Sequence, residues 1–212
     1  MKIRYFVAET IVKWFKRLGF CGALRFRIIR LGYKVFGGCR TGEWDFTFRY
    51  LPPLASIHRN KLKVLDIGCT ASLFIYEIKK RGYLTYGLDQ RDYQERLPND
   101  IMFYKEDIIT CDLNWKFHYI VALSMMEHVG LEIKNYNTKK IENGDRKAIE
   151  NIHKLLKDDG YFIITVPVEH WENIELRGYT PRMFLNLIKG LFDIYEITQK
   201  DGQICAVLIK SL

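Results

Sequence analysis

Two acidic residues, Asp66 and Asp89, are spaced as a nucleoside site requires. Asp89 ends the apolar run Leu84–Leu88, about 20 residues past a turn at Gly68, where an acid is placed to accept hydrogen bonds from ribose hydroxyls. Asp66 lies just before that turn, where a phosphate would need donors, so its carboxylate suits a ligand with a cationic amino group. The pair predicts a nucleoside-containing ligand.

A strand, turn, helix and strand must position these acids. Val64–Ile67 is an apolar run too short for a helix, and helical spacing begins after Gly68. The second apolar run ends at Asp89, within the roughly 30 residues of a right-handed parallel crossover. Both acids are therefore expected at the carboxyl ends of neighbouring strands.

The turn itself differs from a dinucleotide-binding loop. Such a loop needs Gly-x-Gly-x-x-Gly, but only Gly68 is glycine, while Thr70 and Leu73 stand at the other two positions. Cys69 lies in the turn and is expected to contribute its backbone. A nicotinamide site and a purely structural turn remain the alternatives.

From Asp66 to Ser72 the turn resembles the first motif of the class I S-adenosylmethionine-dependent methyltransferases, an acid-x-Gly-x-Gly-x-Gly loop, with Thr70 and Ser72 in place of the later glycines. The resemblance implies an α/β fold with a Rossmann-like seven-stranded mixed sheet, its last strand antiparallel, and helices on both faces. It implies S-adenosylmethionine as cofactor. The residues expected to bind it are Asp66, Gly68, Cys69, Thr70, Asp89, Gln90, Asp107, Ile108 and Ser124.

Methyl transfer is an in-line displacement that needs no metal and no covalent nucleophile, so the protein mainly aligns the reactants. The predicted strand His118–Leu123 leads into Ser124–Gly130 at the ligand-binding edge. His128 suits a general base for a hydroxyl acceptor, because its unperturbed pKa lies near 6.5. Glu127 would orient its neighbour or hold the acceptor. The alternative is that His128 anchors the loop.

The polar and aromatic loop Pro167–Tyr179 is expected at the same edge, where His170, Trp171 or Arg177 would contact substrate. His170 is also a rival for the role of base. Further on, Asp201 and Gly202 predict a hairpin between the last two strands, which fits an antiparallel seventh strand.

The segments Glu127–Leu131 and Gly144–Arg146 resemble a narrower, poorly characterised methyltransferase-like family associated with bacterial surface-polysaccharide synthesis. This resemblance implies O- or N-methylation of a sugar or glycolipid intermediate of the cell envelope. Two alternatives stay open. The acceptor is a membrane lipid or quinone, or the chain is a non-catalytic methyltransferase-fold module, as the replaced glycines suggest.

The net charge of +8 is concentrated at the N-terminus, where residues 1–40 carry ten Lys or Arg and one acid, Glu9. We therefore predict a basic amphipathic helical extension, residues 1–42, before a methyltransferase domain, residues 43–212. The extension either packs on the domain or binds an anionic membrane surface. Nucleic acid is not an expected partner, because no recognisable binding module accompanies the charge.

The five cysteines include no Cys-x-x-Cys pair, which fits a reducing cytoplasm. No apolar run reaches the roughly 20 residues that span a bilayer. We therefore expect a cytoplasmic protein, peripheral at the inner membrane face if the basic helices bind lipid. No feature of the sequence indicates an oligomeric state.

Overall fold

The computed structural model describes residues 40–58, 60–71, 74–92, 97–133, 138–169 and 176–211. The chain divides between Trp44 and Asp45, and Asp45–Leu212 forms one compact unit. Nearly all of the predicted basic extension, and with it the predicted membrane contact, lies outside the described residues. Among the residues that are described, no helix is long and apolar enough to cross a membrane.

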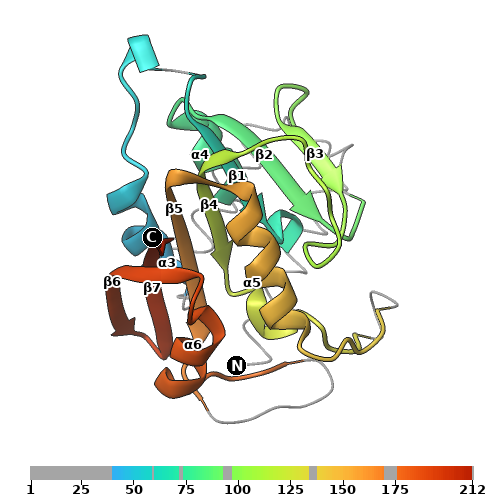
Figure 1. Cartoon of the computed structure of the whole chain (residues 1–212). Coiled ribbons are helices and arrows are strands. Elements are labelled where there is room, and N and C mark those ends of the chain that lie inside the picture. The colour runs from blue at the N-terminus through green and yellow to red at the C-terminus, as the bar shows by residue number, and fades with distance from the viewer. Residues whose placement is uncertain are drawn as a thin grey trace, which may run out of the picture. The chain divides into compact units, whose positions relative to one another are not determined.

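In the described part of the chain a seven-stranded mixed sheet has the order β3-β2-β1-β4-β5-β7-β6 (Figure 1). Its strands are β1 (Lys63–Ile67), β2 (Leu84–Asp89), β3 (Met102–Lys105), β4 (Phe117–Leu123), β5 (Leu156–Pro167), β6 (Phe192–Lys200) and β7 (Gln203–Lys210). The first five are parallel to one another, and β7 runs antiparallel between β5 and β6. The predicted sheet, with its last strand antiparallel, is confirmed.

The helices are α3 (Arg40–Tyr50), α4 (Phe74–Lys80), α5 (Gly144–Leu155) and α6 (Pro181–Ile188), and short 3-10 turns are η1 (Ser56–His58), η2 (Cys69–Ala71) and η4 (Met126–His128). Alternate residues of β1 and β2 face opposite sides of the sheet. Leu65 and Leu88 join the core that contains α5, which lies in front of the strands in Figure 1. Ile75 of α4 joins a second core with Phe103. Helices therefore cover both faces, as predicted.

Local sequence signals account for several element boundaries. Thr180 caps α6 by accepting a hydrogen bond from the Met183 N–H, with Pro181 in the first helical position. Asp201 and Gly202 both have positive φ, 51° and 75°, which matches the primed two-residue turn predicted there.

The fifth strand begins directly after α5, with no loop between them. Leu156 is buried and pairs with Phe117 ahead of a bulge in β4, so the strand starts at Leu156 immediately after α5 ends. Apolar spacing across Leu155 and Leu156 is compatible with a helix, and only the pairing with β4 turns the chain into a strand.

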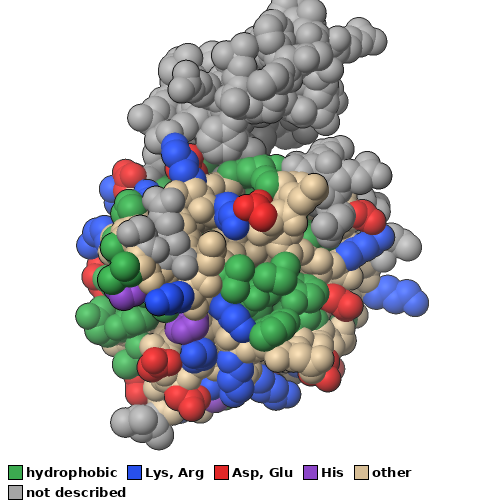
Figure 2. Space-filling view, turned by 90° about the horizontal axis from the view of Figure 1, so that it is seen from above, with side chains coloured by type: hydrophobic (Ala, Val, Ile, Leu, Met, Phe, Trp, Pro, Cys, Tyr) green, Lys and Arg blue, Asp and Glu red, His purple; other side chains and the backbone are tan. Residues whose placement is uncertain are grey.

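Histidines lie at both ends of the sheet. His118 begins β4, His153 ends α5 and His58 precedes β1, so these three lie toward the end where the parallel strands start. Figure 2 views this end and shows His, Lys and Arg side chains around an apolar patch. Burial lowers the pKa of His118 and of His153, and nearby lysines lower it further. Of the described histidines, His128 alone follows the carboxyl end of a strand.

The loop after β4 packs backbone against backbone on the start of α5. A Cβ on Gly144 would lie 2.5 Å from the Gly130 Cα, and a Cβ on Gly130 would lie 2.7 Å from the Gly144 Cα. Gly130 also has φ +75°, which disfavours a side chain there. Two glycines of the narrower motif thus permit the contact that holds η4 against α5.

We expect Gly144→Ala to destabilise the protein by about 1–3 kcal/mol, because the new methyl group meets backbone that has to shift. The unfolding temperature should fall by about 2–4 °C per kcal/mol, measured by calorimetry or circular dichroism. Lys147→Ala, at an exposed position of the same helix, is the control and should leave the temperature nearly unchanged. An unchanged unfolding temperature in Gly144→Ala would contradict the contact.

Candidate active site

The candidate site lies where the strand order reverses, between β1 and β4. Gly68 leaves β1 with φ +74°, and a Cβ on it would lie 3.0 Å from the Met125 Cβ in the loop after β4. Ser124 leaves β4 with φ 45° and donates its N–H to the Thr165 Oγ1 at 2.9 Å. The loops that follow the two strands therefore meet at this point.

Asp66, the last but one residue of β1, is buried, with 3% of its surface exposed. Among the described residues its Oδ2 atom has no hydrogen-bond partner. Burial, and then the charge of Asp89, raises the pKa of Asp66 well above its ordinary range. A buried acid without a donor is the kind of group that a bound cation would satisfy.

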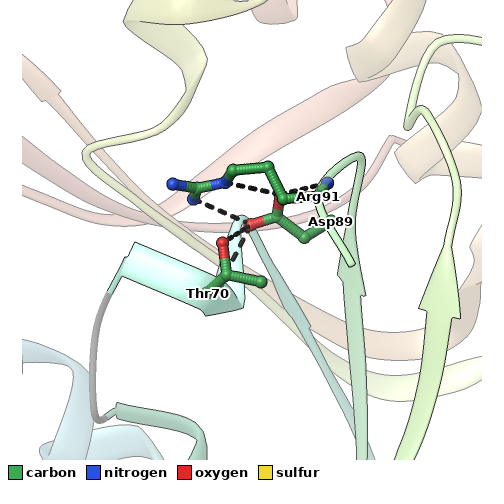
Figure 3. Close-up of polar contacts among 3 residues, drawn as sticks. All are labelled: Thr70, Asp89 and Arg91. Carbon is green, nitrogen blue, oxygen red and sulfur yellow. Dashed lines mark hydrogen bonds and ion pairs between the residues drawn. The ribbon is translucent and has the colours of Figure 1, made fainter. Parts of the chain in front are cut away.

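Asp89 is the last residue of β2. Unlike the Oδ2 atom of Asp66, its carboxylate accepts hydrogen bonds from neighbouring residues (Figure 3). The Thr70 N–H and hydroxyl donate to its Oδ2 at 3.1 and 2.6 Å. Arg91 donates its backbone N–H and Nε–H to Oδ1 at 3.0 and 3.1 Å, and its Nη2 to Oδ2 at 3.1 Å. Burial raises the pKa of Asp89, but the hydrogen bonds from Arg91 and Thr70 outweigh it, and the net pKa is lowered.

The turn residues Cys69 and Thr70, which are not glycine, lie close to the two acids. Thr70, at the position of a family glycine, turns both of its donors toward Asp89. Cys69 is buried, and its Sγ lies 2.8 Å from where a Cβ on Gly87 would be. Burial, with Asp66 and Asp89 nearby, raises the pKa of the Cys69 thiol, which keeps it protonated. In this turn Cys69 therefore serves as packing and Thr70 as a donor to Asp89.

The segment after β3 would form the adenine side of the site. Asp107 accepts a hydrogen bond from the Ile109 N–H at 2.9 Å, and Ile108 is buried. Asn151 of α5 donates to the carbonyls of Ile108 and Cys111, both at 2.8 Å. Asp107 and Ile108 follow the carboxyl end of β3, and Gln90 is exposed beside Asp89.

The short turn η4 carries Glu127 and His128 after β4. Glu127 is buried, and its carbonyl accepts the Arg177 N–H at 2.9 Å. The Tyr179 hydroxyl lies 3.2 Å from the Met126 carbonyl. His128 is partly exposed. Segment 176–179 therefore fixes the position of the predicted catalytic pair.

Arg177, predicted as a substrate contact, forms an ion pair with Asp145 at the start of α5. The Arg177 side chain is only 11% exposed. The Tyr179 hydroxyl lies 3.2 Å from the same carboxylate. Burial and Asp145 raise the pKa of Tyr179, so it remains a phenol that can donate. In this arrangement Arg177 supports η4. The other predicted substrate contacts, His170 and Trp171, lie outside the described residues.

Sequence reasoning missed Arg91, Tyr179 and Asn151. Arg91 lies two residues after Asp89, and that spacing was a usable signal for a local ion pair. The other two act across long separations in the chain, on Met126 and on Ile108, and no local pattern indicates those contacts.

Residues 38–195 match the methyltransferase domain family. The match covers most of the chain, so the protein belongs to this family.

Among curated proteins, the chain is similar to nodulation protein S of Azorhizobium caulinodans, with 29% identity over 112 residues, which is 49% of this chain and 48% of that protein. The aligned region is thus about half the length of each. Solved structures resemble the fold over more of the chain. The N-methyltransferase NodS of Bradyrhizobium japonicum, in complex with S-adenosylhomocysteine, has 16% identity and a TM-score of 0.58 over 82% of this chain and 87% of that one.

Two further structures show the same fold. The 1,6-didemethyltoxoflavin-N1-methyltransferase of Burkholderia thailandensis, with 1,6-didemethyltoxoflavin and S-adenosylhomocysteine bound, has 14% identity and a TM-score of 0.62, covering 82% of this chain and 79% of that one. A TehB-like methyltransferase of Corynebacterium glutamicum has 20% identity and a TM-score of 0.60, covering 89% and 96%.

The raised pKa of Asp66 predicts a pH-dependent stability. The folded state holds a proton that the unfolded state releases near the ordinary value of 3.8, so wild-type stability falls as pH rises from about 4. Asp66→Asn removes this dependence. The difference in unfolding temperature, mutant minus wild type, should therefore increase between about pH 4 and pH 8.

Each kcal/mol of this effect corresponds to about 2–4 °C in calorimetry. Asp193→Asn, an exposed replacement on β6, is the control and should leave the curve parallel to wild type. If the unfolding temperature of Asp66→Asn stays parallel to that of wild type across this pH range, burial does not raise the pKa of Asp66.

Proposed function

We propose that the chain is an S-adenosylmethionine-dependent methyltransferase that O- or N-methylates a sugar or glycolipid intermediate of cell-envelope synthesis. The cofactor supplies, when bound, a methyl group on a positively charged sulfur. In this proposal Asp66 binds the amino group of the cofactor and Asp89 its ribose hydroxyls. Asp107 and Ile108 hold the adenine ring. Gly68 and the loop from Ser124 border the reacting end.

The observation that carries the proposal is the pair of acids at the ends of β1 and β2. The Asp66 carboxyl is buried with an unpartnered Oδ2, and Asp89 is only 7% exposed. An anionic ligand such as a nucleotide phosphate would be repelled here, while an ammonium or sulfonium would be attracted. The residues therefore fit a cationic nucleoside.

His128 is the base in this proposal. An acceptor hydroxyl that takes the methyl group loses its proton, and the His128 imidazole would accept that proton. The cofactor, when bound, would keep the electron pair of the broken methyl–sulfur bond. For an amine acceptor the same group removes the proton that the methylated nitrogen loses. His128 suits this role because it follows the carboxyl end of β4, on a turn that Arg177 and Tyr179 hold in place.

The acceptor class rests on the resemblance of the segments Glu127–Leu131 and Gly144–Arg146 to the family associated with surface-polysaccharide synthesis. The names of two similar structures, N-methyltransferase and N1-methyltransferase, favour nitrogen as the methylated atom. Methylation of a membrane lipid or quinone is the alternative that the basic residues 1–40 would serve.

One observation favours a second candidate, a non-catalytic binding module. Arg91 occupies the carboxylate that the cofactor ribose would need. Binding of the cofactor separates this candidate from the enzyme, because a module that has lost the site would not take it up.

We expect isothermal titration of the full chain to show saturable binding of S-adenosylhomocysteine and none of NAD. Asp89→Asn should weaken binding by about tenfold or more, because a hydrogen bond to a charged acceptor contributes about 1.5–3 kcal/mol. Asp193→Asn is the matched control and should bind as wild type. Saturable binding of NAD with no binding of S-adenosylhomocysteine would overturn the proposal.

Once screening of sugar and glycolipid acceptors identifies a substrate, His128→Gln should lower kcat by about 100-fold or more. It should also remove the fall in rate at acidic pH that protonation of an imidazole base produces. Cofactor affinity should stay unchanged. If the mutant keeps the wild-type pH profile, His128 only anchors the loop, and His170 becomes the residue to replace next.

A further inference from the structure

The carboxylate of Asp89 is already fully engaged by the protein's own donors. From the described residues it accepts at least five hydrogen bonds, from Thr70 and Arg91. An ionised carboxyl offers about four lone-pair sites. A ribose that presents two hydroxyls to Asp89 must therefore displace donors that are present.

The donors differ in how easily they can leave. The N–H groups of Thr70 and Arg91 belong to the backbone after β1 and β2, and Thr70 is only 8% exposed, as is expected of a fixed group. The Arg91 side chain is 34% exposed, and its guanidinium reaches Asp89 from the end of a long, rotatable chain (Figure 3). Of these donors, the Arg91 guanidinium is therefore the one whose exposure and long side chain allow it to move away from Asp89.

We propose that the Arg91 guanidinium occupies the positions on the Asp89 carboxylate that ribose hydroxyls would take, and must leave before those hydroxyls can bind there. This inference rests on the proposed function, because it takes Asp89 as the ribose acceptor. Arg91 is thus a residue that competes with the ligand and sets its affinity.

This competition between Arg91 and the ribose hydroxyls for Asp89 affects the affinity of the ligand. It lowers the affinity of every ribose-bearing ligand by the same factor, the fraction of molecules in which Asp89 is open. A nucleoside that binds only through its base and ribose then becomes a weak ligand. A ligand whose cationic group also reaches the buried Oδ2 of Asp66 has an additional interaction to offset the loss. Arg91 therefore lowers the affinity of charged and neutral nucleosides alike, and the additional interaction with Asp66 is what keeps a charged nucleoside bound.

The test is calorimetric titration of the full chain with S-adenosylhomocysteine. Arg91→Ala should bind it about three- to tenfold more tightly than wild type, because no side chain has to be displaced. Arg91→Lys keeps the charge but lacks the forked donor, so it should lie between the two and serves if the alanine variant folds poorly.

Lys105→Ala is the matched control. Lys105 pairs in register with Asp89 on the neighbouring strand, but its ammonium forms an exposed ion pair with Asp92 at 3.3 Å. The replacement removes the same charge at the same edge without freeing Asp89. Binding should stay within about twofold of wild type, since exposed ion pairs contribute little.

Competition with nucleosides separates displacement from a structural role. Adenosine, with both ribose hydroxyls, should gain the same factor in Arg91→Ala as S-adenosylhomocysteine, whereas 2′,3′-dideoxyadenosine should not gain. If Arg91 only shapes the loop, its loss weakens both nucleosides alike, and the inference is overturned.

The outcomes also distinguish this inference from the function on which it rests. If wild type binds S-adenosylhomocysteine and Arg91→Ala binds it equally or more weakly, the displacement is wrong while cofactor binding stands. Binding by Arg91→Ala alone would support the displacement and show that Arg91 closes the wild-type site. If no variant binds it, both the proposed function and the inference are overturned.

Discussion

The site depends on two carboxyl groups that share one edge of the sheet. Asp66 and Asp89 cannot both carry unsupported charge in a buried environment, and the structure resolves this by distributing donors unequally. Thr70 and Arg91 stabilise the charge of Asp89, while the Asp66 Oδ2 has no partner in the described part of the chain. The pKa of one acid is therefore lowered and that of the other raised. A cationic ligand would balance both.

The departure from the glycine-rich loop has a physical explanation in the same pair. A threonine at the position of a family glycine would block a pyrophosphate, but Thr70 instead supplies two donors to Asp89. The glycine that is kept, Gly68, is the one whose positive φ and contact with Met125 exclude a side chain. The altered loop is therefore consistent with a working site, in which the Thr70 side chain helps to stabilise Asp89, the proposed acceptor for the ribose hydroxyls.

The proposed acceptor side of the site is built from elements far apart in the sequence. The start of α5 contacts the loop after β4, because Gly144 packs against Gly130. Asp145, the next residue of α5, forms an ion pair with Arg177 of segment 176–179. Together these contacts fix the short turn that carries Glu127 and His128. The proposed cofactor side and acceptor side share supporting elements, because Gly68 after β1 meets the loop after β4 and Asn151 of α5 donates to the Ile108 carbonyl.

The sequence alone determined the order of helices and strands and the hairpin at Asp201 and Gly202. It also placed four candidate site residues at or just after strand ends: Asp66, Asp89, Asp107 and Ser124. These features could be predicted because apolar runs and turn residues are local properties of the sequence. Tertiary structure decided what local patterns do not encode. Leu156 became strand because β4 offered a partner, and Arg177 turned to Asp145. Whether Asp66 is charged, and whether Asp89 is open or held by Arg91, follows from burial and from the three-dimensional count of donors around each oxygen.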